Sequence, residues 1–211
     1  LIEQLKRRYK ILFFFIFLVF LVVCFIDKPV AILCQSWYNI NVYTILDFVN
    51  SMGEGWFVIG ILFTLSLIYE FFGKMGHTVI LKISYVAATY AGIFNLVLKF
   101  VFNRQRPSIG IEPYNFFYFF TSGDRKLIDL TYAYNSMPSG HTIITFAAIT
   151  PLMIYIKSPL CRLLFLFYGF IIGAARVYTM NHWTSDVFVS GFLGIAIGLA
   201  IYRTNLYRIE M

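Results

Sequence analysis

Three short segments of the sequence hold side chains of the kinds that bind and cleave phosphate groups. These side chains belong to three cations, two histidines and one carboxylate, which are Lys99, Arg106, Arg176, His141, His182 and Asp186. An arginine offers a planar fork of donors that matches phosphate oxygens, and a lysine adds a point charge. The set therefore suits a tetrahedral dianion.

The spacing within the segments indicates how these groups would act. His182 and Asp186 are four residues apart, so on a helix they would share one face. A carboxylate bonded to one imidazole nitrogen would fix the tautomer and leave the other nitrogen free to attack phosphorus. His141 comes from a different segment and could give a proton to the departing alkoxide.

Each of these residues also has a simpler interpretation when it is taken alone. Lys99 could be the snorkelling end of a membrane helix, and Arg176 could be an interfacial anchor. His141 could follow a helix start that is capped by Ser139. The joint pattern favours the chemical interpretation, because two of the chain's three histidines fall in it.

The composition places these segments in a membrane protein. Of the 211 residues, 60% are hydrophobic and 13% are charged, whereas a soluble domain has about 25% charged residues. The net charge of +7 comes from basic residues beside apolar runs, which suits anionic lipid headgroups, so nucleic acid is not expected as a partner. The length predicts one domain over residues 1–211, and the three cysteines predict neither a disulfide nor a zinc site.

Six apolar runs have lengths close to the thickness of a bilayer core and predict an all-α, polytopic six-transmembrane-helix bundle. The runs cover residues 11–26, 56–72, 78–102, 142–156, 163–178 and 185–202. The first run has a basic leader like that of a signal peptide, but no cleavage site follows it, so we expect a retained helix. Pro151 should kink the fourth helix without ending it.

The basic residues at the ends of these runs predict the orientation of the bundle. With a cytoplasmic N-terminus, ten of the 17 basic residues lie on the cytoplasmic side and seven on the other side. Three of those seven are Lys99, Arg106 and Arg176, which a phosphate site explains better than topology does. Both termini are then cytoplasmic, and all three chemical segments lie at the outer face.

Two further features bear on the packing. Residues 29–55 are amphipathic and aromatic, which fits either a short helix along the outer interface or an ordinary loop. Gly169 and Gly173 in the fifth run, and Gly194 and Gly198 in the sixth, are each four residues apart. Such small-residue faces predict that the last two helices form a tight hairpin.

Together the three segments resemble the signature of the type 2 phosphatidic acid phosphatase superfamily. The signature reads Lys-x6-Arg-Pro, then Pro-Ser-Gly-His, then Arg-x5-His-x3-Asp, and its counterparts here span residues 99–186. The resemblance implies a six-helix membrane phosphatase that uses no metal and no cofactor. It also implies that His182 becomes a phosphohistidine, that His141 is the general acid, and that Asp186 supports His182.

The resemblance further implies which residues hold the phosphate. They are Lys99, Arg106, Ser139, Gly140 and Arg176. The sequence departs from the family pattern at one position, because Ala175 stands where the family usually has serine. The lost hydroxyl contact would contribute on the order of 1–3 kcal/mol to binding a charged group, so the departure bears on phosphate affinity or specificity.

The expected substrate is a lipid phosphate, because the site would open at the membrane surface. By size and character the chain is similar to bacterial lipid A 1-phosphatases, which implies removal of the 1-phosphate of lipid A at the periplasmic face of the inner membrane. Undecaprenyl diphosphate and phosphatidylglycerophosphate phosphatases stay open as alternatives, as does phosphate transfer to a lipid alcohol. A transporter is disfavoured, because the charges gather at one face.

The loop of residues 108–137 is the expected specificity element. Its aromatic run, residues 115–120, could insert at the interface or pack the loop against the helices. Arg125 and Lys126 could attract an anionic headgroup, or they could simply be solvated.

Overall fold

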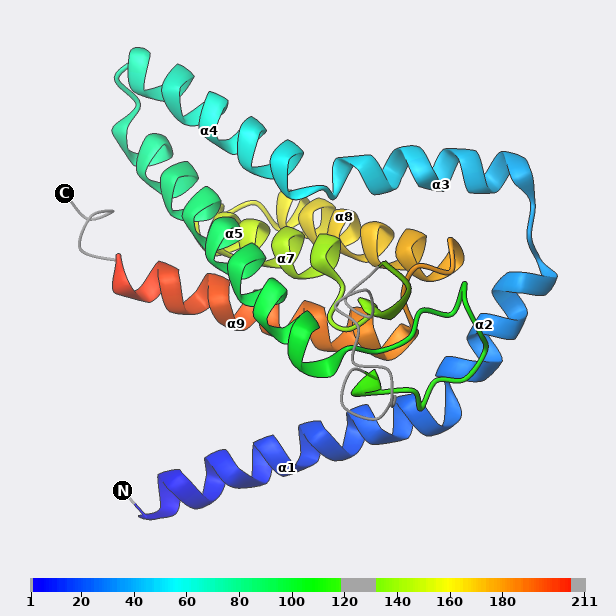
Figure 1. Ribbon diagram of the computed structural model, residues 1–211. Coiled ribbons are helices and arrows are strands. Elements are labelled where there is room, and N and C mark those ends of the chain that lie inside the picture. The colour runs from blue at the N-terminus through cyan, green and yellow to red at the C-terminus, as the bar shows by residue number, and fades with distance from the viewer. Residues whose placement is uncertain (1, 119–131, 206–211) are drawn as a thin grey trace.

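The computed structural model describes residues 2–118 and 132–205, and these residues form helices and loops without a strand (Figure 1). The α-helices are α1 (Ile2–Phe25), α2 (Asp27–Ser36), α3 (Ile40–Met52), α4 (Gly55–Phe71), α5 (Met75–Phe102), α7 (Gly140–Tyr155), α8 (Pro159–Tyr178) and α9 (Thr184–Thr204), with a 3-10 turn at Tyr132–Tyr134. The predicted all-α class is confirmed.

Each of the six predicted spans coincides with one helix, namely α1, α4, α5, α7, α8 or α9. By length and composition α5, α8 and α9 can each cross a membrane alone. The pairs α1–α2 and α3–α4 can each cross as one span bent by 42° and 50°, respectively. The remaining span, α7, is a shorter apolar helix of 16 residues.

The shortest span, α7, is the centre of the bundle. Most of its side chains between Thr142 and Leu152 are buried, and α4, α5, α8 and α9 all pack against it. Figure 1 shows α7 between α5 and α8. Pro151 lies inside α7, which continues beyond it to Tyr155. Protein rather than lipid therefore surrounds the helix that carries the Pro-Ser-Gly-His segment at its start.

The glycines of α8 and α9 pack mainly against α7 and do not make a hairpin of the two helices. A Cβ atom on Gly194 would lie 2.5 Å from the carbonyl oxygen of Ile143, and one on Gly198 would lie 2.8 Å from that of Ala147. Both carbonyls belong to α7, so the backbone of α9 approaches α7 closely. Gly173 does face α9, but the predicted tight hairpin of α8 and α9 is wrong in its main contact, because both helices pack on α7.

Residues 29–55, for which a loop and an interfacial helix were both open, form most of α2 and α3. Helix α3 begins after Asn39, whose side chain accepts hydrogen bonds from the amides of Asn41 and Val42, at 2.9 and 3.3 Å. Helix α2 continues α1 after its bend, and α3 packs along α8. The two helices thus frame the end of the bundle at which α8 finishes and α9 begins.

The three chemical segments lie at one end of the bundle. The start of α1, the end of α9 and the α4–α5 turn lie at the left of Figure 1, whereas α5 and α8 end, and α7 and α9 begin, at the opposite end. The chain therefore brings residues from positions 99 to 186 to a common end, as the predicted topology requires.

The close approach of α9 to α7 gives a stability prediction. Gly194→Ala should lower the free energy of unfolding by about 1–3 kcal/mol, because its Cβ atom would meet the α7 backbone and force the helices apart. Gly60→Ala is the matched control, since no atom lies within 4 Å of the corresponding Cβ position on α4. Thermal unfolding in detergent micelles measures both, and an unchanged midpoint for Gly194→Ala would contradict the packing described.

Candidate active site

His182 lies in the loop between α8 and α9, with the predicted cations gathered around it. Its side chain is 1% exposed, and burial holds its pKa well below the usual value. The positive charges of Arg176, Arg106 and Lys99, and that of His141, lower the pKa further. All four groups therefore lie within electrostatic reach of the imidazole, and His182 is neutral at neutral pH.

A backbone carbonyl sets the tautomer of His182. Its Nδ1 lies 2.5 Å from the carbonyl oxygen of Ser136. A carbonyl oxygen can only accept a hydrogen bond, so Nδ1 must carry the proton and Nε2 must carry the lone pair. Among the described residues none forms a hydrogen bond with Nε2. The imidazole thus presents a free nucleophilic nitrogen.

Asp186 does not hold His182 directly, which corrects the expected carboxylate–imidazole hydrogen bond. The Asp186 Oδ2 atom lies 3.8 Å from His182 Nδ1. The spacing of four residues does not act as it would on a helix, because α9 begins only at Thr184. Asp186 instead accepts hydrogen bonds from the Ser136 hydroxyl at 2.5 Å and the Trp183 amide at 2.9 Å. Its carboxylate is linked to His182 through Ser136.

Arg106 is largely engaged by the protein. Its Nε donates to the Tyr132 carbonyl at 2.6 Å, and the terminal nitrogens donate to the Asn181 carbonyl, the Asn181 side chain and the Asn135 carbonyl. The Tyr132 ring lies 3.7 Å from the guanidinium carbon, and burial lowers the pKa of Arg106. Four of its five N–H groups are therefore used to tie two loops together.

Arg176 and Lys99 differ from Arg106, because neither has a hydrogen bond or ion pair with a described residue. Arg176 sits in the last turn of α8, is 8% exposed, and has a buried Nε atom without a partner in the described chain. Lys99 is half-buried in the last turn of α5. A buried cation without a counter-ion is costly. These two side chains therefore form a ready site for an anion.

The Pro-Ser-Gly-His segment lies at the start of α7. Ser139 is fully buried, its amide donates to the Ser190 hydroxyl at 2.7 Å, and its own hydroxyl accepts from Thr142 at 3.0 Å. The Ser139 amide is therefore engaged within the protein, whereas the Ser139 hydroxyl keeps its own proton available to donate. Gly140 begins α7, and the first amides of a helix lack intrahelical partners and favour anions. His141 follows it, half-buried.

Three polar residues of this region were missed from the sequence. Ser136, Arg104 and Asp27 are all buried and bonded to one another or to Asp186. Arg104 is one of the seven basic residues on the outer side of the predicted topology, and Asp27 directly follows the first apolar run, residues 11–26. The one available signal was the Arg-x-Arg-Pro spacing of residues 104–107, which puts a second arginine beside the first.

Several other expectations concern residues around this cluster. Ala175 is fully buried in α8. Arg125 and Lys126 lie outside the described residues, as do all residues 119–131 of the expected specificity loop. In the described parts of the chain, no group of three His, Cys, Asp or Glu side chains is arranged to hold a metal ion.

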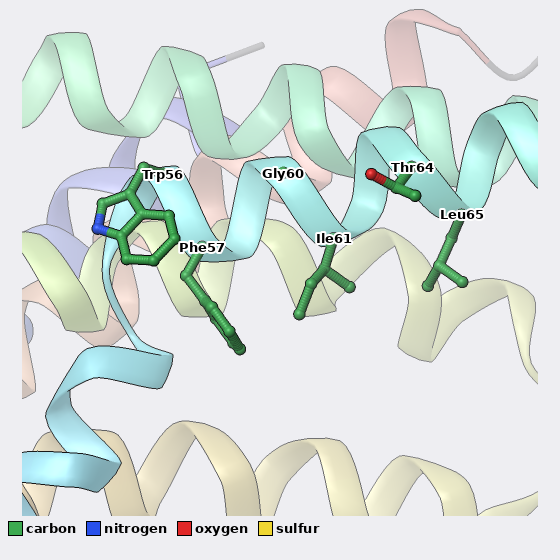
Figure 2. Close-up of a pocket in the computed structure, with 6 residues that line it drawn as sticks. All are labelled: Trp56, Phe57, Gly60, Ile61, Thr64 and Leu65. Atoms are coloured by element: carbon green, nitrogen blue, oxygen red, sulfur yellow. The ribbon is translucent and has the colours of Figure 1, made fainter.

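Two apolar pockets lie away from the motif residues. One, of about 340 Å³, is lined only by residues of α4, and Figure 2 shows Phe57, Ile61 and Leu65 one turn apart on one face of that helix. The other, of about 520 Å³, lies among α2, α3, α8 and α9, where Val177 and Thr184 border it. Neither pocket is lined by a residue of the proposed phosphate cluster.

Comparisons with known proteins show the family and the fold. The model of the PAP2 superfamily matches residues 79–210, and the chain belongs to that superfamily. The crystal structure of Aquifex aeolicus LpxE is similar, with a TM-score of 0.62, 23% sequence identity, and coverage of 84% of this chain and 94% of the other. That similarity shows a shared fold. No curated protein gives a significant sequence match.

The partner-free Arg176 gives a binding prediction that does not depend on turnover. Arg176→Ala should weaken binding of orthovanadate by about 10–100-fold, because hydrogen bonds to a charged group contribute about 1.5–3 kcal/mol. Arg162→Ala is the control, since Arg162 lies near the start of α8 and donates to the Ile156 carbonyl. Titration of the purified protein in detergent gives the two Kd values, and equal values would remove Arg176 from the anion site.

Proposed function

We propose that this protein is a membrane phosphatase that hydrolyses a lipid-linked phosphate through a phosphohistidine on His182. The observation that carries the proposal is a neutral, buried imidazole, protonated at Nδ1, beside two cations that have no partner among the described residues. Membership of the PAP2 superfamily supports a phosphatase. The apolar helices support a membrane-embedded one.

In the first step the Nε2 lone pair of His182 attacks phosphorus. The P–N bond forms as the bond from phosphorus to the lipid oxygen breaks, and His141 protonates that oxygen as it leaves. Arg176 and Lys99 bind the phosphoryl oxygens, with the remaining N–H of Arg106 and the amide of Gly140. These fixed charges supply the stabilisation that a metal supplies elsewhere, so the reaction is proposed to be metal-independent.

In the second step water attacks the phosphohistidine. The neutral His141 side chain takes a proton from the water, the P–N bond breaks, and phosphate leaves with Nε2 restored. The Ser136 carbonyl keeps the Nδ1 proton in place through both steps, and the carboxylate of Asp186 lies 3.8 Å away to favour positive charge on the ring.

The proposed substrate is lipid A, from which the enzyme would remove the 1-phosphate. The fold shared with Aquifex aeolicus LpxE and the placement of the cluster at one end of the apolar helices support a large lipid phosphate. Under the predicted topology the protein lies in a bacterial inner membrane, with both termini in the cytoplasm and the site facing the periplasm. Undecaprenyl diphosphate and phosphatidylglycerophosphate are the competing substrates.

The covalent intermediate gives the central test. His182→Ala should lose phosphate release by at least about 1,000-fold and should bind no acid-labile label from a radiolabelled lipid phosphate. His77→Ala is the control, because His77 packs between Tyr69 and Tyr155 on other helices. Both variants must elute as folded protein in detergent. Retained turnover in His182→Ala would end the covalent mechanism.

A panel of lipids tests the substrate. Purified protein is offered lipid A, undecaprenyl diphosphate, phosphatidylglycerophosphate and phosphatidic acid, and released phosphate is measured. Lipid A is expected to show the highest kcat/KM. A higher value for another lipid would replace the proposed substrate, and a newly phosphorylated lipid in place of free phosphate would indicate transfer rather than hydrolysis.

A further inference from the structure

Arg104 lies two residues before Arg106 but has a different environment. It is completely buried, and its Nε and one terminal nitrogen donate to the Pro113 carbonyl at 3.1 and 2.7 Å. The guanidinium carbon lies 4.3 Å from the centre of the Phe116 ring and 5.3 Å from that of Trp183. Enclosed in this way, Arg104 cannot reach a substrate.

The remaining donors of Arg104 reach two carboxylates and a hydroxyl. One terminal nitrogen donates to Asp186 at 2.5 Å and to the Ser185 hydroxyl at 2.7 Å, and the other donates to Asp27 at 2.8 Å. With the two bonds to Pro113, all five N–H groups are used. Arg104 is therefore a fixed bridge between the α1–α2 bend and the first turn of α9.

Asp27 completes this bridge from the other side. It is 1% exposed, and it accepts from the Ser185 amide at 2.8 Å and from the Ser185 hydroxyl at 2.5 Å. An anion at these amides also suits the positive end of the α9 dipole. The residue lies outside residues 79–210, so the N-terminal helices add a carboxylate that the family match does not include.

The bridge leads to the nucleophile through Ser136. The Ser136 amide donates to the Arg104 carbonyl at 3.0 Å, and its hydroxyl donates to Asp186, whose other oxygen is held by Arg104. Ser136 is thus fixed at two points, and its carbonyl is aimed at His182 Nδ1. The first anchor is the backbone of residue 104, and the second, Asp186, is held by the Arg104 side chain.

We propose that Arg104, held in place by Asp27, is a positioning residue that fixes Ser136 and Asp186 so that the Ser136 carbonyl keeps His182 in the tautomer with a bare Nε2. The inference rests on the proposed function, in which Nε2 attacks phosphorus. It assigns the N-terminal helices a part in catalysis, because Asp27 ties the α1–α2 bend to the positioning network.

The tautomer of His182 tests this directly and without substrate. The chain has three histidines, so selective ¹⁵N labelling yields three imidazoles, which His77→Gln and His141→Gln assign. The wild type should show His182 protonated at Nδ1 and bare at Nε2. In Arg104→Met and Ser136→Ala the signal should change to a mixture of tautomers. An unchanged Nδ1–H signal in both folded variants would overturn the proposal.

Kinetics separate positioning from a purely structural role. In Ser136→Ala and Asp27→Asn, phosphoenzyme formation should slow by about tenfold or more while the orthovanadate Kd stays within about twofold, because the anion-binding cations are untouched. Lys28→Ala is the matched control beside Asp27, since Lys28 forms only an exposed ion pair with Glu112. A lower unfolding temperature with wild-type rate and tautomer would assign the network to stability alone.

The two proposals can fail separately. If Arg104→Met does not fold because it leaves two buried carboxylates unpaired, Ser136→Ala decides the positioning role, since it removes only one hydroxyl. If His182→Ala retains turnover, the phosphohistidine mechanism fails whatever the tautomer spectra show. If His182→Ala is inactive but the tautomer and rate are unchanged in Ser136→Ala and Asp27→Asn, only the positioning role fails.

Discussion

At one end of the helical bundle, some buried cations form ion pairs with carboxylates of the described chain and others do not. The candidate site depends on that difference. Arg104 meets Asp27 and Asp186 and has every donor satisfied. Arg176 and Lys99 form no ion pair or hydrogen bond with a described residue. Because a buried cation without an ion pair is costly, these two side chains are suited to binding an anion. Phosphate, with its tetrahedral oxygens, is such an anion.

The state of His182, the proposed nucleophile, depends on the same arrangement. A buried imidazole among cations stays neutral, and a backbone carbonyl decides which nitrogen carries its proton. A carbonyl can serve this purpose only if its own residue is held firmly, and Ser136 is held by Arg104 and Asp186. Asp27 and Asp186 thus neutralise Arg104. Because both carboxylates are engaged there, they form no ion pair with Arg176 or Lys99.

The helical architecture explains how such distant residues meet. The central helix α7 is contacted on several sides, and glycines on α9 let that helix approach its backbone. The ends of α5 and α8 and the starts of α7 and α9 therefore converge, and each brings one motif residue or one pair of them. The first two helices add Asp27 to this end, although they lie before the segment that defines the PAP2 superfamily.

The sequence by itself determined the residue types, the membrane class and the common end at which the motifs meet. Apolar runs of bilayer length, and rare polar residues between them, depend only on local composition and spacing. It could not determine the partner of each polar group. The expected Asp186–His182 hydrogen bond failed because α9 starts after His182, and the expected α8–α9 hairpin failed because α7 lies within reach of both helices. Asp27 pairs with Arg104, which is 77 positions away in the sequence. Only the tertiary structure brings these two residues together.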